Sequence, residues 1–464
     1  MKKLKFTILA LFITINYTMY AQTLQGSYTI GSGGNYTTIA SAMSALTTNG
    51  ISGNVTFNIL SGTYTAANLD FSSGIPNQGS NDTITFISNS KSANDVSITS
   101  NGTALTLNNV KNLVIKNITL NAVNGTKGVE ITGTCNNLLI DSCIILASTT
   151  GYSSSQSGIY RANSSSTTNT IIISNNTIKG GYYGIYLYGT NYNNYSPNIT
   201  IKNNIVSETY QGGIYCYYLS LNSFSNNSIT ARTINYSSTF YGCYVTYCNA
   251  SVIEKNNIRI TNQNITSPYG MICQYLNYRN TTTPGLICNN QIIVYTRYNY
   301  YGMYITNSRV NIYHNSVFMG GNGVARALYI SASAGLPVNI RNNNLHLLNP
   351  SAYPIYIYTG VEYLGQTLKM DYNNYYNQSY VGFAGSDAAT LEDWHFITGQ
   401  DIHSVSTYPY YPNIASFSLE TDGIGLICPR INSVMNDKQD TLRQAITTMG
   451  AYHDYIPPTY DIRI

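Results

Sequence analysis

The chain has 464 residues, of which 43% are hydrophobic and only 9% are charged, and its formal net charge is +4. This hydrophobic content supports a large buried core and excludes a disordered polyelectrolyte, while the sparse charge argues against a nucleic-acid-binding surface. The polarity of the chain comes instead from Asn, Thr, Ser and 45 Tyr residues.

Residues 1–21 predict an export signal. Lysines lie among the first five residues, an apolar run extends from Phe6 to Ile15, and Ala21 ends the segment. The apolar run is too short to span a bilayer, and no Cys follows it that would accept a lipid anchor. Because no later stretch is long and apolar enough for a transmembrane helix, we expect a soluble product that is secreted or held at the cell surface.

Residues 22–54 predict an N-terminal cap that contains a helix. Apolar residues at helical spacing follow a Thr, and Asn49-Gly50 ends the pattern. These apolar residues are Ile39, Ala42, Met43 and Leu46. Such a helix would close the open end of a rod of stacked coils, which otherwise exposes its core and an unpaired strand edge.

Residues 55–385 predict a stack of coils, because one short motif recurs along them. An apolar residue, two spacers, an Asn, one spacer and a second apolar residue return every 23 to 34 residues. The eight Asn residues are Asn176, Asn204, Asn227, Asn256, Asn290, Asn315, Asn343 and Asn373. A repeat of this period indicates a stacked array. Because Asn readily adopts the left-handed conformation, we expect each Asn to form a bend, and coils about 4.8 Å apart would join the amides into a ladder.

A second repeat follows each Asn by about ten residues and predicts a strand. Its apolar residues alternate with polar ones at period two, as Ile185 and Leu187 do in the second coil of this repeat. The apolar positions should point inward and the intervening tyrosines outward, in one column along the rod. This column comprises Tyr160, Tyr186, Tyr215, Tyr244, Tyr304, Tyr329 and Tyr356.

Residues 386–464 predict an irregular C-terminal cap, which contains Trp394, the single Trp of the chain. Asp393, Asp401 and His403 lie near this Trp and could be read as a metal site. Their spacing matches no zinc or EF-hand pattern, so we prefer a hydrogen-bonded cap and expect neither a metal nor another cofactor.

Two segments carry a family resemblance. The Gly-Ser-Gly, aromatic and Thr-Ile sequence at residues 31–39 resembles the N-terminal segment of the pectin lyase-like superfamily. The segments 391–404, 437–443 and 448–452 are similar to the end of large secreted β-helix repeat proteins of Bacteroidetes type. The resemblance implies an all-β, right-handed parallel β-helix with an N-terminal cap helix and an irregular C-terminal cap. Members of this superfamily include lyases, hydrolases, esterases, adhesins and tailspikes, so the fold leaves the function open.

The eight cysteines divide into two groups. Cys216, Cys243 and Cys273 occupy inward positions of the strand repeat, where a free thiol behaves as a small apolar side chain. Cys135 and Cys143 could instead pair across a turn if their Cα atoms lie within about 7 Å. The pattern assigns no partner to the remaining cysteines, which are Cys248, Cys288 and Cys428.

Glu130 and Arg161 are the candidate catalytic residues. Glycoside hydrolysis needs two carboxylates at one bond, but the coils from Ser142 to Met370 contain only three acidic residues, at unrelated positions. Glu130 continues the outward Tyr column, and Arg161 occupies a position where an inward apolar residue is expected. The two could form a substrate clamp. We prefer the alternative that a bulge turns Arg161 outward to pair with Glu130, because unpaired buried charge is rare.

Three functions remain compatible with the sequence. We prefer a non-catalytic, monomeric rod that binds a polysaccharide or cell-surface glycan, or mediates adhesion, through outward Tyr and Arg columns. Tyr rings offer flat apolar faces with hydroxyl rims that suit stacking on sugar rings. The first alternative is a polysaccharide lyase or glycoside hydrolase that acts in a groove on the coils, and the second is a structural spacer of a surface protein.

Overall fold

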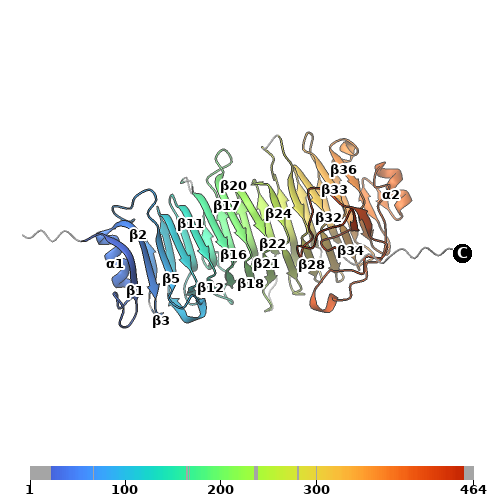
Figure 1. Cartoon of the computed structure of the whole chain (residues 1–464). Helices are drawn as coiled ribbons and strands as arrows, with labels where there is room; N and C mark the ends of the chain where they lie inside the picture. Colours follow the sequence, from blue (N-terminus) through green and yellow to red (C-terminus); the bar gives the residue numbers. More distant parts are fainter. Residues whose placement is uncertain are drawn as a thin grey trace, which may run out of the picture.

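The computed structural model describes residues 22–453, apart from 66, 163–165, 167, 235–238, 280–281 and 299. Within this part the chain winds into an elongated rod of stacked coils whose faces are three parallel sheets (Figure 1). The predicted all-β class and parallel β-helix architecture are confirmed. The export signal predicted at 1–21 and the end of the predicted C-terminal cap, 454–464, lie outside the described residues. No helix of the described part is long and apolar enough to cross a bilayer.

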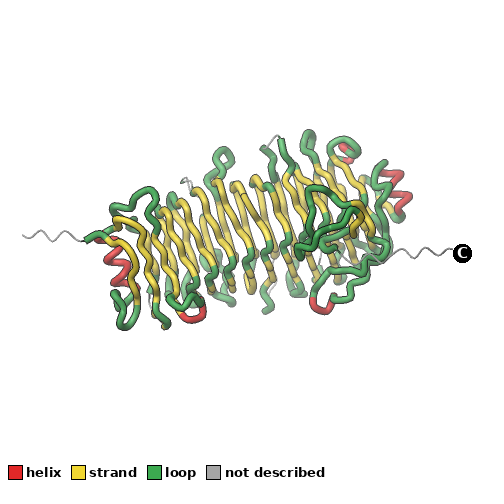
Figure 2. The backbone as a smooth tube through the Cα atoms, viewed as in Figure 1, coloured by secondary structure: helices red, strands yellow, loops and turns green. Residues whose placement is uncertain are grey.

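Each coil contributes one strand to sheet A, then one to sheet B and one to sheet C, so that equivalent strands lie side by side along the rod (Figure 2). Sheet A has the strand order β1 (Leu24–Ile30), β2 (Ile51–Ile59), β5 (Ile84–Ser88), β8 (Lys111–Lys116), β11 (Asn136–Asp141), β14 (Asn169–Ser174), β17 (Ser196–Lys202), β20 (Leu219–Ser225), β24 (Val252–Glu254), β27 (Gly285–Cys288), β30 (Val310–Tyr313), β33 (Val338–Arg341) and β36 (Leu368–Asp371), with β23 (Asn249–Ala250) beside β20.

Sheet B has the strand order β3 (Gly62–Thr65), β6 (Val96–Thr99), β9 (Thr119–Ala122), β12 (Ile144–Ala147), β15 (Thr177–Lys179), β18 (Ile205–Thr209), β21 (Ser228–Ala231), β25 (Asn257–Ile260), β28 (Gln291–Tyr295), β31 (Ser316–Gly320), β34 (Asn344–Leu347) and β37 (Asn374–Tyr376). Sheet C has the strand order β4 (Leu69–Phe71), β7 (Leu105–Asn108), β10 (Lys127–Thr132), β13 (Ser157–Arg161), β16 (Tyr183–Tyr188), β19 (Gly212–Tyr217), β22 (Thr239–Thr246), β26 (Ser267–Gln274), β29 (Tyr300–Thr306), β32 (Ala325–Ser331), β35 (Tyr353–Thr359), β38 (Gly382–Ala384) and the antiparallel β39 (Asp387–Ala388).

The core of the rod is built from the inward positions of all three sheets. In sheet C, Ile185 pairs with Ile214 and Leu187 with Cys216, and all four side chains are buried. Complete burial of such an aliphatic side chain contributes about 1.5–3 kcal/mol. The recurring Gly before these strand residues also has a packing reason. A Cβ at Gly242 would lie only 2.4 Å from Ile258 Cγ2, so the narrow edge between sheets B and C leaves no room for a side chain.

The eight repeated Asn residues form one continuous column at the corner between sheets A and B, here called the ladder corner. In the first seven of them, the amide Nδ2 donates to Oδ1 of the Asn in the next coil, over 2.9–3.0 Å. The backbone N–H groups of the same residues donate to the same Oδ1 atoms. All eight side chains are at most 1% exposed, so the ladder satisfies amides that would otherwise be costly to bury.

The bend at the ladder corner is formed by the residue before each ladder Asn, which corrects the sequence-based prediction. Positive φ angles occur at Asn175, Asn203 and Asn226, and the ladder residues that follow them have none. In other coils Lys255 and His314 occupy the same left-handed position. The ladder Asn is therefore required for its buried amide, and the left-handed turn tolerates several residue types.

Helices close both ends of the described rod (Figure 1). At the N-terminal end, α1 (Ile39–Asn49) begins with a capping box between Thr38 and Ser41 and buries the four predicted apolar residues against the first coils. At the other end, α2 (Leu391–Thr398) places Trp394, which is fully buried, against the last coil. Both helices therefore shield core that a further coil would have covered.

The chain beyond α2 also runs back along the side of the rod, in a segment here called the strap (residues 405–453). It includes the antiparallel pair β40 (Ile427–Pro429) and β41 (Ile446–Thr448). The buried Arg443 guanidinium donates to Asn289 Oδ1 and Gly450 O, both at 2.9 Å. Further back, Lys438 Nζ donates to Lys255 O at 2.7 Å. The predicted C-terminal cap therefore combines an end cap with a segment that crosses several coils.

All eight cysteines are buried free thiols. Cys216, Cys243 and Cys273 lie in the core as predicted, with no exposed surface. Cys135 and Cys143 are free as well, so the disulfide considered for them is not formed. Burial raises the pKa of the Cys143 thiol to about 12, which keeps it protonated and unreactive.

Candidate functional site

The outer face of sheet C is covered by tyrosine. The predicted column is in register through the strand pairs, so that Tyr160, Tyr186, Tyr215 and Tyr244 lie in consecutive coils. Ile272 interrupts the column, which then continues with Tyr304, Tyr329 and Tyr356. A parallel column three residues earlier in each strand contains Tyr241, Tyr269 and Tyr301. The face is therefore aromatic and hydroxyl-rich along much of the rod.

Within the predicted column the rings stack on one another. The centroids of Tyr215 and Tyr244 are 4.4 Å apart with planes at 6°, and those of Tyr304 and Tyr329 are 4.5 Å apart at 7°. Neighbouring tyrosines therefore cover the ring faces, and the stack presents ring edges and hydroxyl groups to solvent. The expectation that sugars stack on open faces along this column does not fit this arrangement.

The partly buried tyrosine hydroxyls of this face stay uncharged over a wide pH range. Burial is the main cause that raises the pKa of the Tyr186 and Tyr269 hydroxyls, in each case to about 12. Neighbouring phenols add to the effect, because two adjacent phenolates would repel each other. At physiological pH these hydroxyls can both donate and accept hydrogen bonds, which suits a neutral polar ligand.

The structure does not bring Glu130 and Arg161 together. Glu130 lies on the outer face, in register with Tyr160, and its carboxylate pairs with Lys127 Nζ at 3.1 Å. Arg161 is 1% exposed and lies in register with the inward residue Leu187. The bulge that would turn Arg161 outward is therefore not present, and the two candidate catalytic side chains lie on opposite faces of sheet C.

Arg161 is instead a buried charged side chain with few hydrogen-bond partners, which is electrostatically unfavourable. Its Nη2 donates to Ser166 O, whereas Nε and Nη1 have no hydrogen-bond partner within the described residues. Burial lowers the pKa of the guanidinium. The sequence periodicity placed this residue correctly on the inward face, and the assumption that buried charge must be paired gave the wrong orientation.

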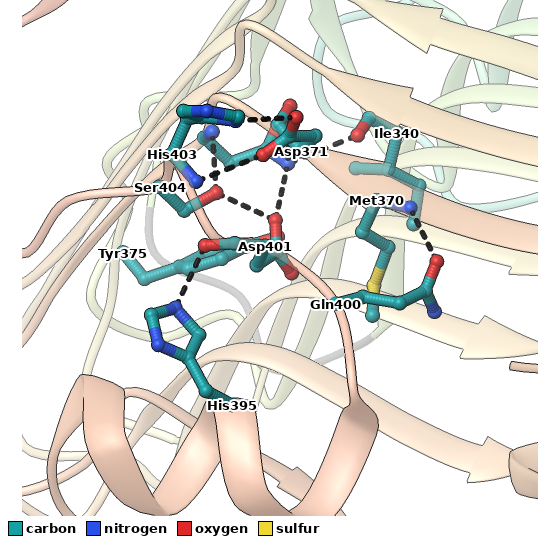
Figure 3. A network of polar contacts seen from close by, with 10 residues as sticks. Ile340, Met370, Asp371, Tyr375, His395, Gln400, Asp401, His403 and Ser404 are labelled. Carbon is teal, nitrogen blue, oxygen red and sulfur yellow. Dashed lines mark hydrogen bonds and ion pairs between the residues drawn. The ribbon is translucent and has the colours of Figure 1, made fainter. Parts of the chain in front are cut away.

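Asp393, Asp401 and His403 also have separate roles, and Figure 3 shows the contacts of Asp401 and His403. Asp393 belongs to the capping box of α2 with Thr390. Asp401 is buried and ends the Asn ladder, since its carboxylate accepts Asn373 Nδ2 and Trp394 Nε1 at 3.2 and 2.8 Å. His403 Nδ1 lies 3.0 Å from Asp371 Oδ2. No group of three or more His, Cys, Asp or Glu residues suited to a metal ion occurs in the described part of the chain.

A second tyrosine cluster, which the sequence analysis did not identify, lies at the corner between sheets C and A. Backbone hydrogen bonds relate Tyr218, Tyr247, Tyr275 and Asn307 as equivalent residues of consecutive coils. All four have a positive φ, between 46° and 55°. We call this column the tyrosine corner. A signal was present in the sequence, because a Tyr directly follows the strand repeat in three consecutive coils.

The tyrosine corner ends in a cleft of about 500 Å³. The rings of Tyr247 and Tyr275 stack at 4.3 Å and 5°, and the next coil places the smaller Asn307 at this corner. The cleft forms where the stack stops. Its lining residues are Tyr275, Tyr278, Asn307, Ser333, Ala334 and Leu336. This combination of aromatic rings, an amide and a hydroxyl is typical of a small-molecule site with a few orienting polar groups.

The fold and these surfaces define the chain as a parallel β-helix rod with a tyrosine-covered face. No family model matches the chain, and no curated protein matches its sequence.

Proposed function

We propose that the chain is a secreted or cell-surface β-helix rod, related to the pectin lyase-like superfamily, that binds glycans without cleaving them. The single observation that supports binding is the tyrosine surface of sheet C and its corner, which carries few charged side chains, is rich in hydroxyl groups and extends along the rod. A polysaccharide is likewise extended, neutral or weakly charged, and rich in hydroxyl groups. Export is supported by the basic and apolar composition of residues 1–21.

Affinity electrophoresis tests the proposal directly. The chain from residue 22 onward is run in native gels that contain neutral or acidic polysaccharides, with an unrelated protein of similar size as the reference. We expect at least one polysaccharide to retard the rod. Normal migration in every gel would overturn the proposal and favour the structural spacer.

The same incubations distinguish binding from cleavage. We expect no new reducing ends and no unsaturated products in the supernatant after prolonged incubation with the retarding polysaccharide. Release of either product would establish a hydrolase or a lyase and would contradict the non-catalytic part of the proposal.

A double substitution locates the binding face. Changing Tyr186 and Tyr215 together to Ala removes two adjacent rings from the stacked column, so we expect weaker retardation from a rod that still folds. Changing both to Phe keeps the stack and removes only the hydroxyl groups. Unchanged retardation of both double variants would show that this part of sheet C takes no part in binding.

A further inference from the structure

The cleft at the end of the tyrosine corner differs from the rest of the tyrosine surface in one respect. In the stacked column of sheet C neighbouring rings cover one another, whereas this cleft is open and lined by two rings. The Tyr275 and Tyr278 rings lie 5.6 Å apart at 85°, so they form two walls that meet nearly at a right angle. Tyr278 is 42% exposed. Aromatic surface is therefore accessible here, which the stacked column does not offer.

The polar groups of the cleft form an ordered pair. Ser333 Oγ donates to Asn307 Oδ1, which fixes the orientation of both side chains. Asn307 Nδ2 donates to no described residue, and the Ser333 oxygen keeps lone pairs that can accept. The cleft therefore presents a hydrogen-bond donor and an acceptor side by side, next to an aromatic wall.

The backbone at this site is costly to maintain. A bulky residue with positive φ is an outlier, and the left-handed conformation costs an ordinary residue free energy that Gly and Asn largely avoid. Tyr275 has φ 51°, and its equivalents Tyr218 and Tyr247 share this conformation. At the ladder corner most coils place Asn in the left-handed position instead. Strain of this kind is typical of functional positions.

From these observations we propose that the cleft is a subsite for one pyranose ring that carries adjacent free hydroxyl groups. The apolar C–H face of the sugar packs on Tyr275 or Tyr278, one hydroxyl accepts from Asn307 Nδ2, and its neighbour donates to Ser333 Oγ. The volume of about 500 Å³ holds a single ring and leaves room for the flanking sugars of a chain to leave the cleft. This inference rests on the proposed function, because it assigns the glycan a particular place on the rod.

Substitutions that suit the left-handed backbone test the subsite without disturbing the fold. The probe is the polysaccharide that most strongly retards the wild-type rod, and affinity is measured by titration in affinity gels. Tyr275→Asn removes one aromatic wall, and Asn307→Asp replaces the donor with an acceptor. We expect each variant to bind at least about tenfold more weakly, with an unchanged thermal unfolding midpoint within a few degrees.

Tyr218→Asn makes the same change at the same corner two coils away from the cleft, and it distinguishes a single subsite from binding along the whole corner. Tyr372→Asn is the matched control, because it makes the same change at a left-handed tyrosine of the ladder corner, outside the tyrosine surface. We expect the affinity of both variants to lie within about twofold of the wild type. If Tyr275→Asn and Asn307→Asp bind as the wild type does, the subsite is wrong while the proposed function stands. If Tyr218→Asn loses as much affinity as Tyr275→Asn, binding extends over the whole corner and the single-ring subsite is also wrong. A wild-type rod that no polysaccharide retards overturns both proposals.

Periodate oxidation tests the chemistry of the ligand. Periodate cleaves the carbon–carbon bond between adjacent free hydroxyls, giving two aldehydes while iodate is formed as the reduced product. We expect the oxidised polysaccharide, reduced with borohydride to remove its aldehydes, to lose its retardation of the wild-type rod. Equal retardation before and after this treatment would contradict a requirement for adjacent hydroxyls.

Discussion

The ladder corner and the tyrosine corner use the same left-handed backbone conformation but carry different side chains. Both join strands of neighbouring sheets through a residue with positive φ. At the ladder corner the next residue is a buried Asn whose amide bonds to the coil above, so the corner holds the register of the rod. At the tyrosine corner the left-handed residue itself carries a partly exposed ring. The ladder corner therefore has a structural role, whereas for the tyrosine corner we propose a role in binding.

The largest effect should follow from breaking the ladder corner. Asn256→Ala removes Oδ1, which accepts both the backbone N–H and the Nδ2 of Asn227 at 3.0 Å. The buried backbone N–H of Asn227 loses its partner, Asn227 Nδ2 keeps only Ile201 O, and Asn290 loses a donor to its Oδ1. Because each unsatisfied buried group costs about 1–3 kcal/mol, we expect a loss of about 3–5 kcal/mol in the free energy of unfolding by urea.

Asn222→Ala is the control for this loss. Asn222 is exposed, and its amide meets Asn198 Oδ1 only at 3.5 Å, near the limit of a hydrogen bond. We expect a change within about 0.5 kcal/mol, as for other surface substitutions. Equal losses for Asn222→Ala and Asn256→Ala would show that the buried ladder has no special role.

The end of the ladder should be the next most sensitive place. Asp401 Oδ2 accepts Trp394 Nε1 at 2.8 Å, and Oδ1 accepts the Ser404 hydroxyl at 2.6 Å. Asp401→Asn keeps the shape but directs an NH₂ group at one of these donors. We expect the free energy of unfolding to fall by about 2–3 kcal/mol, measured by urea denaturation with Trp394 fluorescence as the probe. A variant as stable as the wild type would contradict the assignment of Asp401 as the ladder terminus.

Alkaline pH should act on the tyrosine surface and spare the ladder, because its eight Asn side chains do not titrate. Burial raises the pKa of Tyr186 and Tyr269 to about 12, above the ordinary value of 10.0. A raised pKa means that the folded rod holds these protons more tightly than the unfolded chain does. The resulting stability is fully present below pH 10 and is lost as the pH rises from about 10 to 12.

Absorbance at 295 nm measures this effect. We expect buried tyrosines such as Tyr186 and Tyr269 to ionise only above pH 11, together with unfolding detected by circular dichroism. Titration of all tyrosines in one step near pH 10, with the rod still folded, would contradict the buried stack.

The smallest effect on stability is expected at the tyrosine corner. Tyr275→Asn loses the stacking of Tyr275 on Tyr247, worth about 0.5–1.5 kcal/mol, but places at φ 51° a residue that tolerates this conformation. The two terms nearly cancel, so we expect the free energy of unfolding in urea to change by about 1 kcal/mol or less. A loss above about 3 kcal/mol would show that this corner, like the ladder, is mainly structural.

Much of the fold could be predicted from the sequence, because the apolar residues and Asn of the repeats recur at the positions that are buried in each coil. The left-handed residue was placed one position too late for an identifiable reason. Most ladder residues follow another Asn, as Asn176 follows Asn175, so the two roles could not be separated there. Lys255 and Tyr372 precede ladder residues without being Asn, and their left-handed conformation shows that the bend lies one position earlier.

The cleft could not be predicted in the same way. Tyr275, Asn307 and Ser333 come from three coils, and the loops that bring them together vary in length from coil to coil. The strap, in contrast, could have been inferred from the outward residues of sheet B. These change from polar residues such as Lys179 to apolar ones such as Phe318 where the strap covers them. The orientation of Arg161 was predicted wrongly, because buried charged side chains are rare and an outward orientation was therefore preferred.

Hydrogen–deuterium exchange with and without the retarding polysaccharide would compare both corners in one measurement. The account predicts that the glycan slows exchange of the backbone amides in segments 275–278, 307–309 and 333–336, around the cleft. It predicts no change at 255–257 and 289–291, where the ladder already protects the amides. Slowed exchange elsewhere, for example along the strap, with none at the tyrosine corner would contradict the division between an architectural corner and a binding corner.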